Sequence, residues 1–290
     1  MYIRDLLASK PITFSCELFP PKAGMDLARA DEVVEQTARL MPDFISVTYG
    51  ASGNTSHNTV RMARSIEDQG RTALAHLTCV SASRDGIQAR LDEMRSSGIE
   101  NVLALRGDLP EGMTKPDDAC FQHADELVRV VKAHGGFCIG GACYPEGHTE
   151  SASQEEDILN LKRKVDAGCD FLTTQMFFDN DIFYRFLYKL HAKDINVPVL
   201  AGLMPVTNKN QIGRIVKLSG TYVPPRFLNI LDRFGDDPAA MEQAGIAYAT
   251  EQIIDLVANG VRGVHLYTMN RPDIAGRIIA NLSNILKLGK

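Results

Sequence analysis

Short apolar runs alternate with longer amphipathic stretches along the whole chain. Eight of these runs are nearly continuous in aliphatic and small residues, which is typical of parallel strands buried on both faces. The predicted strands cover residues 12–19, 44–50, 72–80, 101–108, 137–144, 171–178, 198–206 and 263–270.

The stretches between the strands have the pattern of helices with one apolar face. Residues 84–97 follow Ser83, a favoured N-cap residue type, and residues 157–167 end before Gly168, as helices commonly do. Similar patterns cover residues 27–40 and 124–133. Each of these helices lies between two predicted strands, so strand and helix alternate.

The spacing of the strands predicts the fold. Consecutive strands begin roughly 30 residues apart, the length of one strand plus one helix. Before the last strand there is room for extra helices, which we place at 224–234 and 239–258. We therefore predict an α/β fold, a single-domain (β/α)8 TIM barrel over residues 1–290 with extra helices between strands 7 and 8. A doubly wound open sheet is the alternative.

Charge and composition narrow the class of protein. Lys and Arg number 31 against 36 Asp and Glu, a net charge of −5. The chain thus lacks the basic excess of a general nucleic-acid or membrane-surface binder. It has no long apolar run, and Asp5 and Lys10 interrupt its beginning, so we expect neither a membrane helix nor a secretion signal. Six cysteines without a Cys-x-x-Cys pair indicate reduced, buried thiols in a cytoplasmic protein.

Polar residues gather toward the carboxyl ends of the predicted strands, where barrel active sites lie. Glu17 interrupts an otherwise apolar or small run. Burial would raise its pKa and suit it to general-acid catalysis, although a structural ion pair is the alternative. Arg106 and Asp108 flank Gly107, a residue that lets a ligand approach the backbone. A turn with a surface ion pair would give the same pattern.

Three further features have two interpretations each. His76 is either a core histidine or a ligand contact, and Gln175 either binds a heterocycle edge or caps a backbone group. One flank of the helix at 157–167 either holds a diphosphate and a ribose or is simply a solvated face. That flank carries Asp157, Asn160, Arg163 and Lys164. Glycine-rich motifs of the Rossmann or P-loop type do not occur in the sequence. No two histidines have the spacing of metal ligands on a helix, so we expect no metal.

Seven strand-end strings carry a family resemblance. They are FSCELFPP (14–21), SVTYGA (46–51), HLTC (76–79), ALRGDLP (104–110), YPE (144–146), NLKRKVDAG (160–168) and YTMNR (267–271). Together and in this order they resemble the bacterial-type methylenetetrahydrofolate reductases over nearly the whole chain. The resemblance implies an FAD-containing barrel that uses NADH or NADPH to reduce 5,10-methylenetetrahydrofolate to 5-methyltetrahydrofolate for methionine biosynthesis. It also implies a homo-oligomer without a regulatory domain.

The resemblance also implies roles for individual residues. Glu17 would be the general acid that opens the five-membered folate ring, and Asp108 would stabilise the cationic iminium. Folate contacts would be Asp108, Gln175, Gln211 and Arg271. Flavin or nicotinamide contacts would be Thr48, Tyr49, Ala51, His76, Arg106, Gly107, Asp108, Ala124, Tyr144, His148, Ser151, Asp157, Asn160, Arg163 and Lys164.

The chain departs from the family pattern at two positions. Ile215 stands where some members have an aromatic residue over the substrate, and Lys209 replaces a more apolar residue. No pair of arginines is placed for a 2′-phosphate, which favours NADH. Two alternatives stay open: another flavin-dependent barrel, such as a proline-dehydrogenase-like enzyme, and a barrel that binds folate or flavin without turnover.

Overall fold

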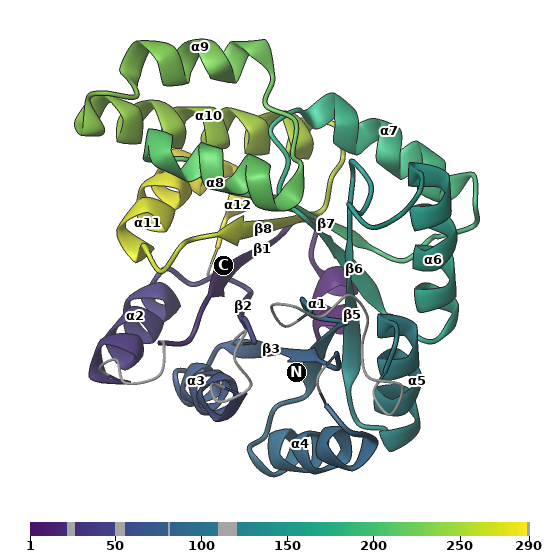
Figure 1. Cartoon of the computed structure of the whole chain (residues 1–290). Coiled ribbons are helices and arrows are strands. Elements are labelled where there is room, and N and C mark those ends of the chain that lie inside the picture. Colours follow the sequence, from purple (N-terminus) through teal and green to yellow (C-terminus); the bar gives the residue numbers. More distant parts are fainter. Residues whose placement is uncertain (22–26, 50–55, 81, 110–120, 289–290) are drawn as a thin grey trace.

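The eight predicted strands close into a barrel. The computed structural model describes residues 1–21, 27–49, 56–80, 82–109 and 121–288. The strands are β1 (Thr13–Leu18), β2 (Phe44–Val47), β3 (Thr72–Thr78), β4 (Asn101–Leu105), β5 (Cys138–Cys143), β6 (Phe171–Thr174), β7 (Val199–Leu203) and β8 (Gly263–Tyr267). Each pairs in parallel with its neighbours in chain order, and β8 pairs with β1. Figure 1 shows this ring, which confirms the (β/α)8 barrel and rules out the open sheet.

Helices surround the barrel, and those at 27–39, 84–96, 124–134 and 154–166 lie where the sequence analysis names a helix. The surrounding helices are α2 (Leu27–Arg39), α3 (Ser56–Asp68), α4 (Arg84–Ser96), α5 (Ala124–His134), α6 (Gln154–Asp166), α7 (Asn180–His191), α8 (Lys209–Ser219) and α11 (Pro272–Asn281). The extra helices between β7 and β8 are confirmed as α9 (Pro225–Phe234) and α10 (Pro238–Ala258). Two short helices were not predicted, α1 (Ile3–Ser9) and α12 (Ser283–Leu286). The side chain of Ser83 caps α4 by accepting from the Gly86 N–H, as its residue type indicates.

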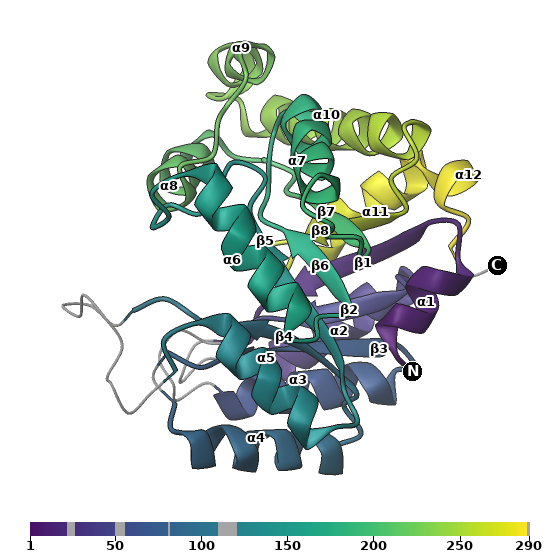
Figure 2. The same cartoon turned by 90° about the vertical axis from the view of Figure 1, so that its right-hand side faces the viewer.

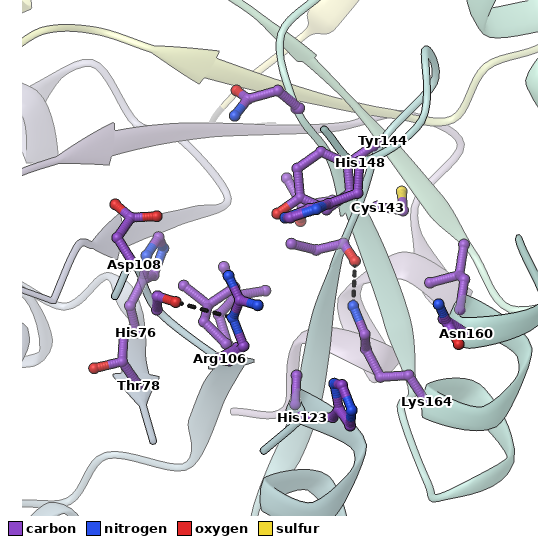
Figure 3. A pocket seen from close by; sticks show the side chains of 18 of the residues that line it. His76, Thr78, Arg106, Asp108, His123, Cys143, Tyr144, His148, Asn160 and Lys164 are labelled. Carbon is purple, nitrogen blue, oxygen red and sulfur yellow. Dashed lines mark hydrogen bonds between the residues drawn. The ribbon is translucent and has the colours of Figure 1, made fainter. Parts of the chain in front are cut away.

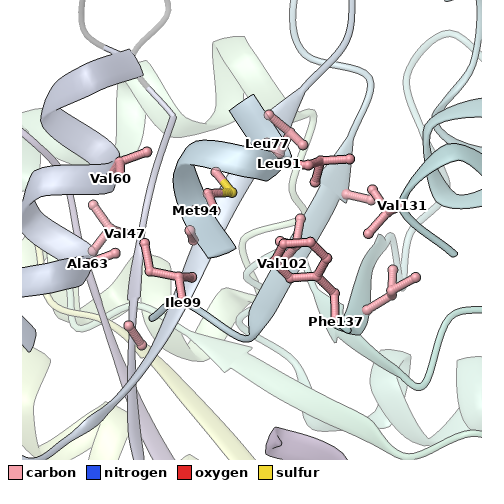
Figure 4. Close-up of a cluster of buried hydrophobic side chains, with 14 of the residues drawn as sticks. Val47, Val60, Ala63, Leu77, Leu91, Met94, Ile99, Val102, Val131 and Phe137 are labelled. Carbon is pink, nitrogen blue, oxygen red and sulfur yellow. The ribbon is translucent and has the colours of Figure 1, made fainter. Parts of the chain in front are cut away.

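A shell of apolar side chains lies between the strands and the outer helices. Its largest cluster includes outward-facing strand residues such as Val47, Leu77 and Val102. Figure 4 shows them packed against side chains of α3, α4 and α5, among them Val60 and Leu91. Removing so much apolar area from water stabilises the fold and holds the strand ends in fixed positions.

A second cluster fills one end of the barrel interior. Phe44, Leu103 and Phe171 point inward there and meet Ile3 and Leu7 of α1. The backbone N–H of Ile3 donates to the Asn101 side chain over 2.8 Å, at the start of β4. Figure 2 shows α1 at this end of the barrel. Because α1 covers the amino ends of the strands, the polar part of the interior opens at their carboxyl ends.

Most of the cysteines are structural. Cys16, Cys79, Cys138, Cys143 and Cys169 are free and buried, while Cys120 lies outside the described residues. Burial raises the pKa of Cys16 to about 12, so this thiol is a poor nucleophile at neutral pH. Among the helices of the described residues, none combines the length and apolar character needed to cross a membrane.

Candidate active site

A cavity of about 860 Å³ lies at the carboxyl ends of the strands. Its wall contains most of the residues that the sequence singles out, which lie at the ends of strands, in the loops that follow them and on α5 and α6. These residues are Glu17, Thr48, Tyr49, His76, Arg106, Gly107, Asp108, Ala124, Tyr144, His148, Ser151, Asp157, Asn160, Arg163, Lys164 and Gln175. Figure 3 shows part of this wall.

Two expected contacts, Gln211 and Arg271, are not in this wall, and a third falls on a residue that the structure does not describe. Gln211 lies in the first turn of α8, where its side chain accepts from the N–H groups of residues 207 and 208. Arg271 forms ion pairs with Asp273 and Glu242 at 2.6 and 3.1 Å. Ala51 lies outside the described residues. The folate roles of Gln211 and Arg271 therefore stay predictions.

Glu17 lies deep in the cavity between two histidines. Its Oε2 is 3.5 Å from Nε2 of His76 and 3.5 Å from Nε2 of His265. Ser46 donates to the same oxygen over 3.5 Å. The other ring nitrogen of His265 is 2.8 Å from the Ser15 hydroxyl, which fixes the orientation of the imidazole. Four strands, β1, β2, β3 and β8, thus supply this cluster.

These neighbours change the acidity expected of Glu17. Burial raises the pKa of Glu17 and is the largest single effect. The hydrogen bond from His265, the positive charge that His76 and His265 carry when they are protonated, and the Ser46 hydroxyl together outweigh burial, so the pKa of Glu17 lies below its ordinary value. The sequence-based expectation of a raised pKa is therefore wrong for this arrangement. Burial lowers the pKa of His76 to about 4, so this ring is uncharged at neutral pH.

Replacing His265 by Phe should raise the pKa of Glu17. The substitution removes a hydrogen bond and a nearby positive charge but leaves the carboxyl buried, so burial becomes dominant. A pH titration of the carboxyl by difference infrared spectroscopy measures the shift. His123→Phe, on the α5 side of the cavity, is the matched control and should leave the pKa in place. An unchanged pKa in His265→Phe would contradict the assigned role of the histidine.

The cavity wall formed by β4, β5 and α6 is rich in polar and cationic groups. Lys164 donates to the Ala142 carbonyl over 2.6 Å, which brings its ammonium from α6 to the end of β5. Burial raises the pKa of Asp157, the largest effect on this group, whereas Lys164 and hydrogen bonds from His148 and Ser151 oppose it. This wall can accept a ligand that carries both phosphates and hydroxyl groups.

Gly107 and Gly202 allow close approaches that shape the cavity. Gly107 has φ +88°, and a Cβ there would lie 2.9 Å from the Thr78 side chain. A Cβ on Gly202 would lie 2.2 Å from the Thr174 carbonyl oxygen. That oxygen accepts from the Tyr267 hydroxyl over 2.6 Å, directly before Gln175. Both positions therefore require glycine.

For Gln175 and for Arg106, both interpretations offered by the sequence hold in part, because each residue lines the cavity and also makes a local structural contact. Gln175 lines the cavity, and its side-chain oxygen also accepts from the Met176 N–H over 3.0 Å. Arg106 lines the cavity and also forms an ion pair, but with Glu150 on the β5–α6 loop and not with Asp108. The sequence analysis did not single out Glu150, His123 or His265.

The fold and the site define a (β/α)8-barrel protein with a polar small-molecule cavity built around a buried carboxylate. The family model described as methylenetetrahydrofolate reductase matches residues 2–283. The 5,10-methylenetetrahydrofolate reductases of Pectobacterium carotovorum subsp. carotovorum and Escherichia coli (strain K12) are each 34% identical over 272 residues, covering 93% of this chain and 90% of the relative. The chain therefore belongs to the methylenetetrahydrofolate reductase family.

A solved structure supports the fold independently. An uncharacterized protein from Clostridium thermocellum, described as binding two copies of 5-methyl-5,6,7,8-tetrahydrofolic acid, superposes with a TM-score of 0.61. The match covers 99% of both chains at 13% sequence identity, so it shows a shared architecture.

Proposed function

We propose that this protein is a cytoplasmic, homo-oligomeric methylenetetrahydrofolate reductase that binds FAD, takes hydride from NADH or NADPH and forms 5-methyltetrahydrofolate for methionine biosynthesis. The observation that carries the proposal is the buried Glu17 between two histidines, in the same cavity as Asp108. A reduction that opens a ring by protonating nitrogen needs such an acid beside a carboxylate that stabilises positive charge.

The residues of the cavity fit a flavin dinucleotide. Arg106, Arg163 and Lys164 would hold the diphosphate, and Asp157 and Asn160 would take ribose hydroxyls. When bound, FAD supplies the chemistry that carries hydride from the nicotinamide to the folate.

Two further details support the same fit. Nε2 of His76 lies 3.5 Å from Oε2 of Glu17 but is buried without a hydrogen bond among the described residues, so it can serve a ligand atom. Gly107 lets the backbone approach a flat ring without a side chain in between. The other expected flavin contacts in the wall are Thr48, Tyr49, Ala124, Tyr144, His148 and Ser151.

The positions of the side chains support the catalytic roles that the family resemblance implies. Glu17 donates its proton to the ring nitrogen of the folate as the C–N bond opens. His265, held by Ser15, fixes the direction in which this carboxyl points. Asp108 faces the cavity and stabilises the cationic iminium that accepts hydride. Gln175 presents an amide to the edge of the bound heterocycle.

Folate binding should be accompanied by proton uptake at neutral pH. The pKa of Glu17 is held below its ordinary value by groups that act against burial, and a ring bound over the carboxyl removes more water and raises that pKa. Calorimetric titrations in buffers of different ionisation enthalpy count the protons taken up. Glu17→Gln should abolish the uptake. Equal heats in all buffers for the wild type would contradict the assignment of Glu17 as the acid.

Steady-state kinetics test the proposed reaction. If the same cavity serves the nicotinamide and the folate in turn, initial-rate plots at several folate concentrations give parallel lines. Intersecting lines would contradict alternate use of one site. If the protein oxidised proline and did not reduce the folate, it would instead be a proline-dehydrogenase-like flavin barrel. Binding of folate and flavin without product would indicate a non-catalytic barrel.

A further inference from the structure

Glu150 forms a two-pronged ion pair with Arg106 in the wall of the cavity. Nη1 and Nη2 of the guanidinium lie 2.5 and 2.7 Å from the two carboxylate oxygens. Nε donates to the Gly107 carbonyl over 3.2 Å. All three nitrogens of Arg106 therefore have a partner, and both terminal nitrogens face the same carboxylate.

The loop that carries Glu150 is held close to the cationic side of the cavity. The Glu150 N–H donates to Nδ1 of His148 over 3.1 Å, and the Ser151 N–H donates to the His148 carbonyl. Arg106 holds the pKa of Glu150 below its ordinary value, with smaller contributions from His148 and His123. Glu150 is consequently ionised at neutral pH, and Arg106, His148 and His123 lie near it at the end of β4, on the loop and at the start of α5.

A carboxylate and a phosphate use the same two N–H groups of an arginine. Glu150 is 54% exposed, whereas the Arg106 side chain is 21% exposed. The carboxylate can therefore swing into water with little loss of hydration, while the guanidinium stays in the cavity wall. An anionic ligand that takes these same two N–H groups, end-on across both terminal nitrogens of Arg106, must displace Glu150.

We propose that Glu150 occupies the position on Arg106 that a phosphate group of the dinucleotide cofactor takes, so that Glu150 limits the affinity of the protein for FAD. This inference rests on the proposed function, because it assumes that the phosphates lie at Arg106. Glu150 then lowers the affinity for FAD by competing with a phosphate for Arg106, and removal of the Glu150 charge strengthens FAD binding. A residue that only positioned Arg106 would have the opposite effect.

The test compares cofactor binding by the flavin-stripped full-length protein and its variants, followed by quenching of flavin fluorescence. Glu150→Gln removes the competing charge, and Glu150→Asp keeps the charge on a shorter side chain. Glu155→Gln is the matched control, since it loses the same charge from α6 at a carboxylate paired with Lys193, away from the cavity. Each protein is titrated with FAD and with riboflavin, which has no phosphate. A thermal melt confirms that the variants are folded.

Glu150→Gln should bind FAD about two- to fivefold more tightly than the wild type. The expected gain is small because a partly exposed ion pair such as Arg106–Glu150 contributes little free energy. Riboflavin affinity and the Glu155→Gln control should not change. Higher salt should narrow the difference, because it screens the Arg106–Glu150 pair.

Equal or weaker FAD binding by Glu150→Gln would overturn the inference and leave the proposed function intact. An equal gain for riboflavin would also overturn it, since the effect would then not involve a phosphate. Absence of FAD binding in every protein, the wild type included, would overturn the proposed function and this inference with it.

Discussion

Glu17→Gln should reduce methylenetetrahydrofolate about 10²- to 10⁴-fold more slowly than the wild type, while the reaction with NADH keeps nearly its full rate. Glutamine has the shape of glutamate and can still bond to His265 and Ser46, so the substitution leaves no unpaired buried charge. It cannot deliver a proton to the folate nitrogen. Stopped-flow measurements of the two half-reactions separate the effects.

The control for this experiment is Glu67→Gln. Glu67 is also a partly buried carboxylate, and its Oε1 accepts from the Ala73 N–H over 2.8 Å, a bond that glutamine retains. It lies outside the cavity wall, so both half-reactions should proceed at wild-type rates. Full folate reduction by Glu17→Gln would show that Glu17 is not the acid. Loss of both half-reactions would indicate that Glu17 instead supports the flavin site.

Gly202→Ala should destabilise the barrel by about 3 kcal/mol. The new Cβ would lie 2.2 Å from the Thr174 carbonyl oxygen and 2.8 Å from the Tyr267 ring, which are the two partners of one buried hydrogen bond. The backbone of β6 is paired with β5 on one side and β7 on the other, so it cannot shift without loss of strand hydrogen bonds. Urea denaturation measures the change in the free energy of unfolding.

Gly213→Ala is the matched control for this substitution. Gly213 lies in α8, and apart from its chain neighbours and the helix's own backbone no atom is found within 4 Å of a Cβ placed there. Alanine in a helix is more favourable than glycine by about 1 kcal/mol, so this variant should be slightly more stable than the wild type. If Gly202→Ala were as stable as Gly213→Ala, the close contact between β6, β7 and Tyr267 would not be as tight as described.

The sequence was sufficient to predict the barrel because strand burial depends on local pattern. Apolar runs bounded by polar residues gave all eight strands, although five predicted ranges extend by three residues or more past the ends of β2, β4, β6, β7 and β8. The range 101–108, for example, extends past the end of β4 at Leu105. The last residues of that run leave the sheet where Gly107 takes a positive φ. The helix α1 was missed because seven residues give too weak a periodic signal.

The acidity of Glu17 could not be predicted in the same way. Its strand shows an isolated acid among apolar and small residues, which indicates burial and a raised pKa. His265, which helps to reverse that shift, is 248 positions away in the sequence and meets Glu17 only when β8 closes on β1. The polar residues Ser15 and Glu17 of β1 are two positions apart, as are His265 and Tyr267 of β8, so each pair faces one side of its strand. In the closed barrel Ser15 pairs in register with His265 and Glu17 with Tyr267.

We propose that one cavity passes electrons from a nicotinamide through a flavin to a folate. An anaerobic visible absorbance spectrum of the purified protein, recorded before and after NADH and then after methylenetetrahydrofolate, tests it most directly. We predict a flavin band that bleaches with NADH and returns with the folate. A colourless protein that takes up no added FAD would contradict the account, and a band that bleaches but does not return would leave a flavoenzyme with a different acceptor.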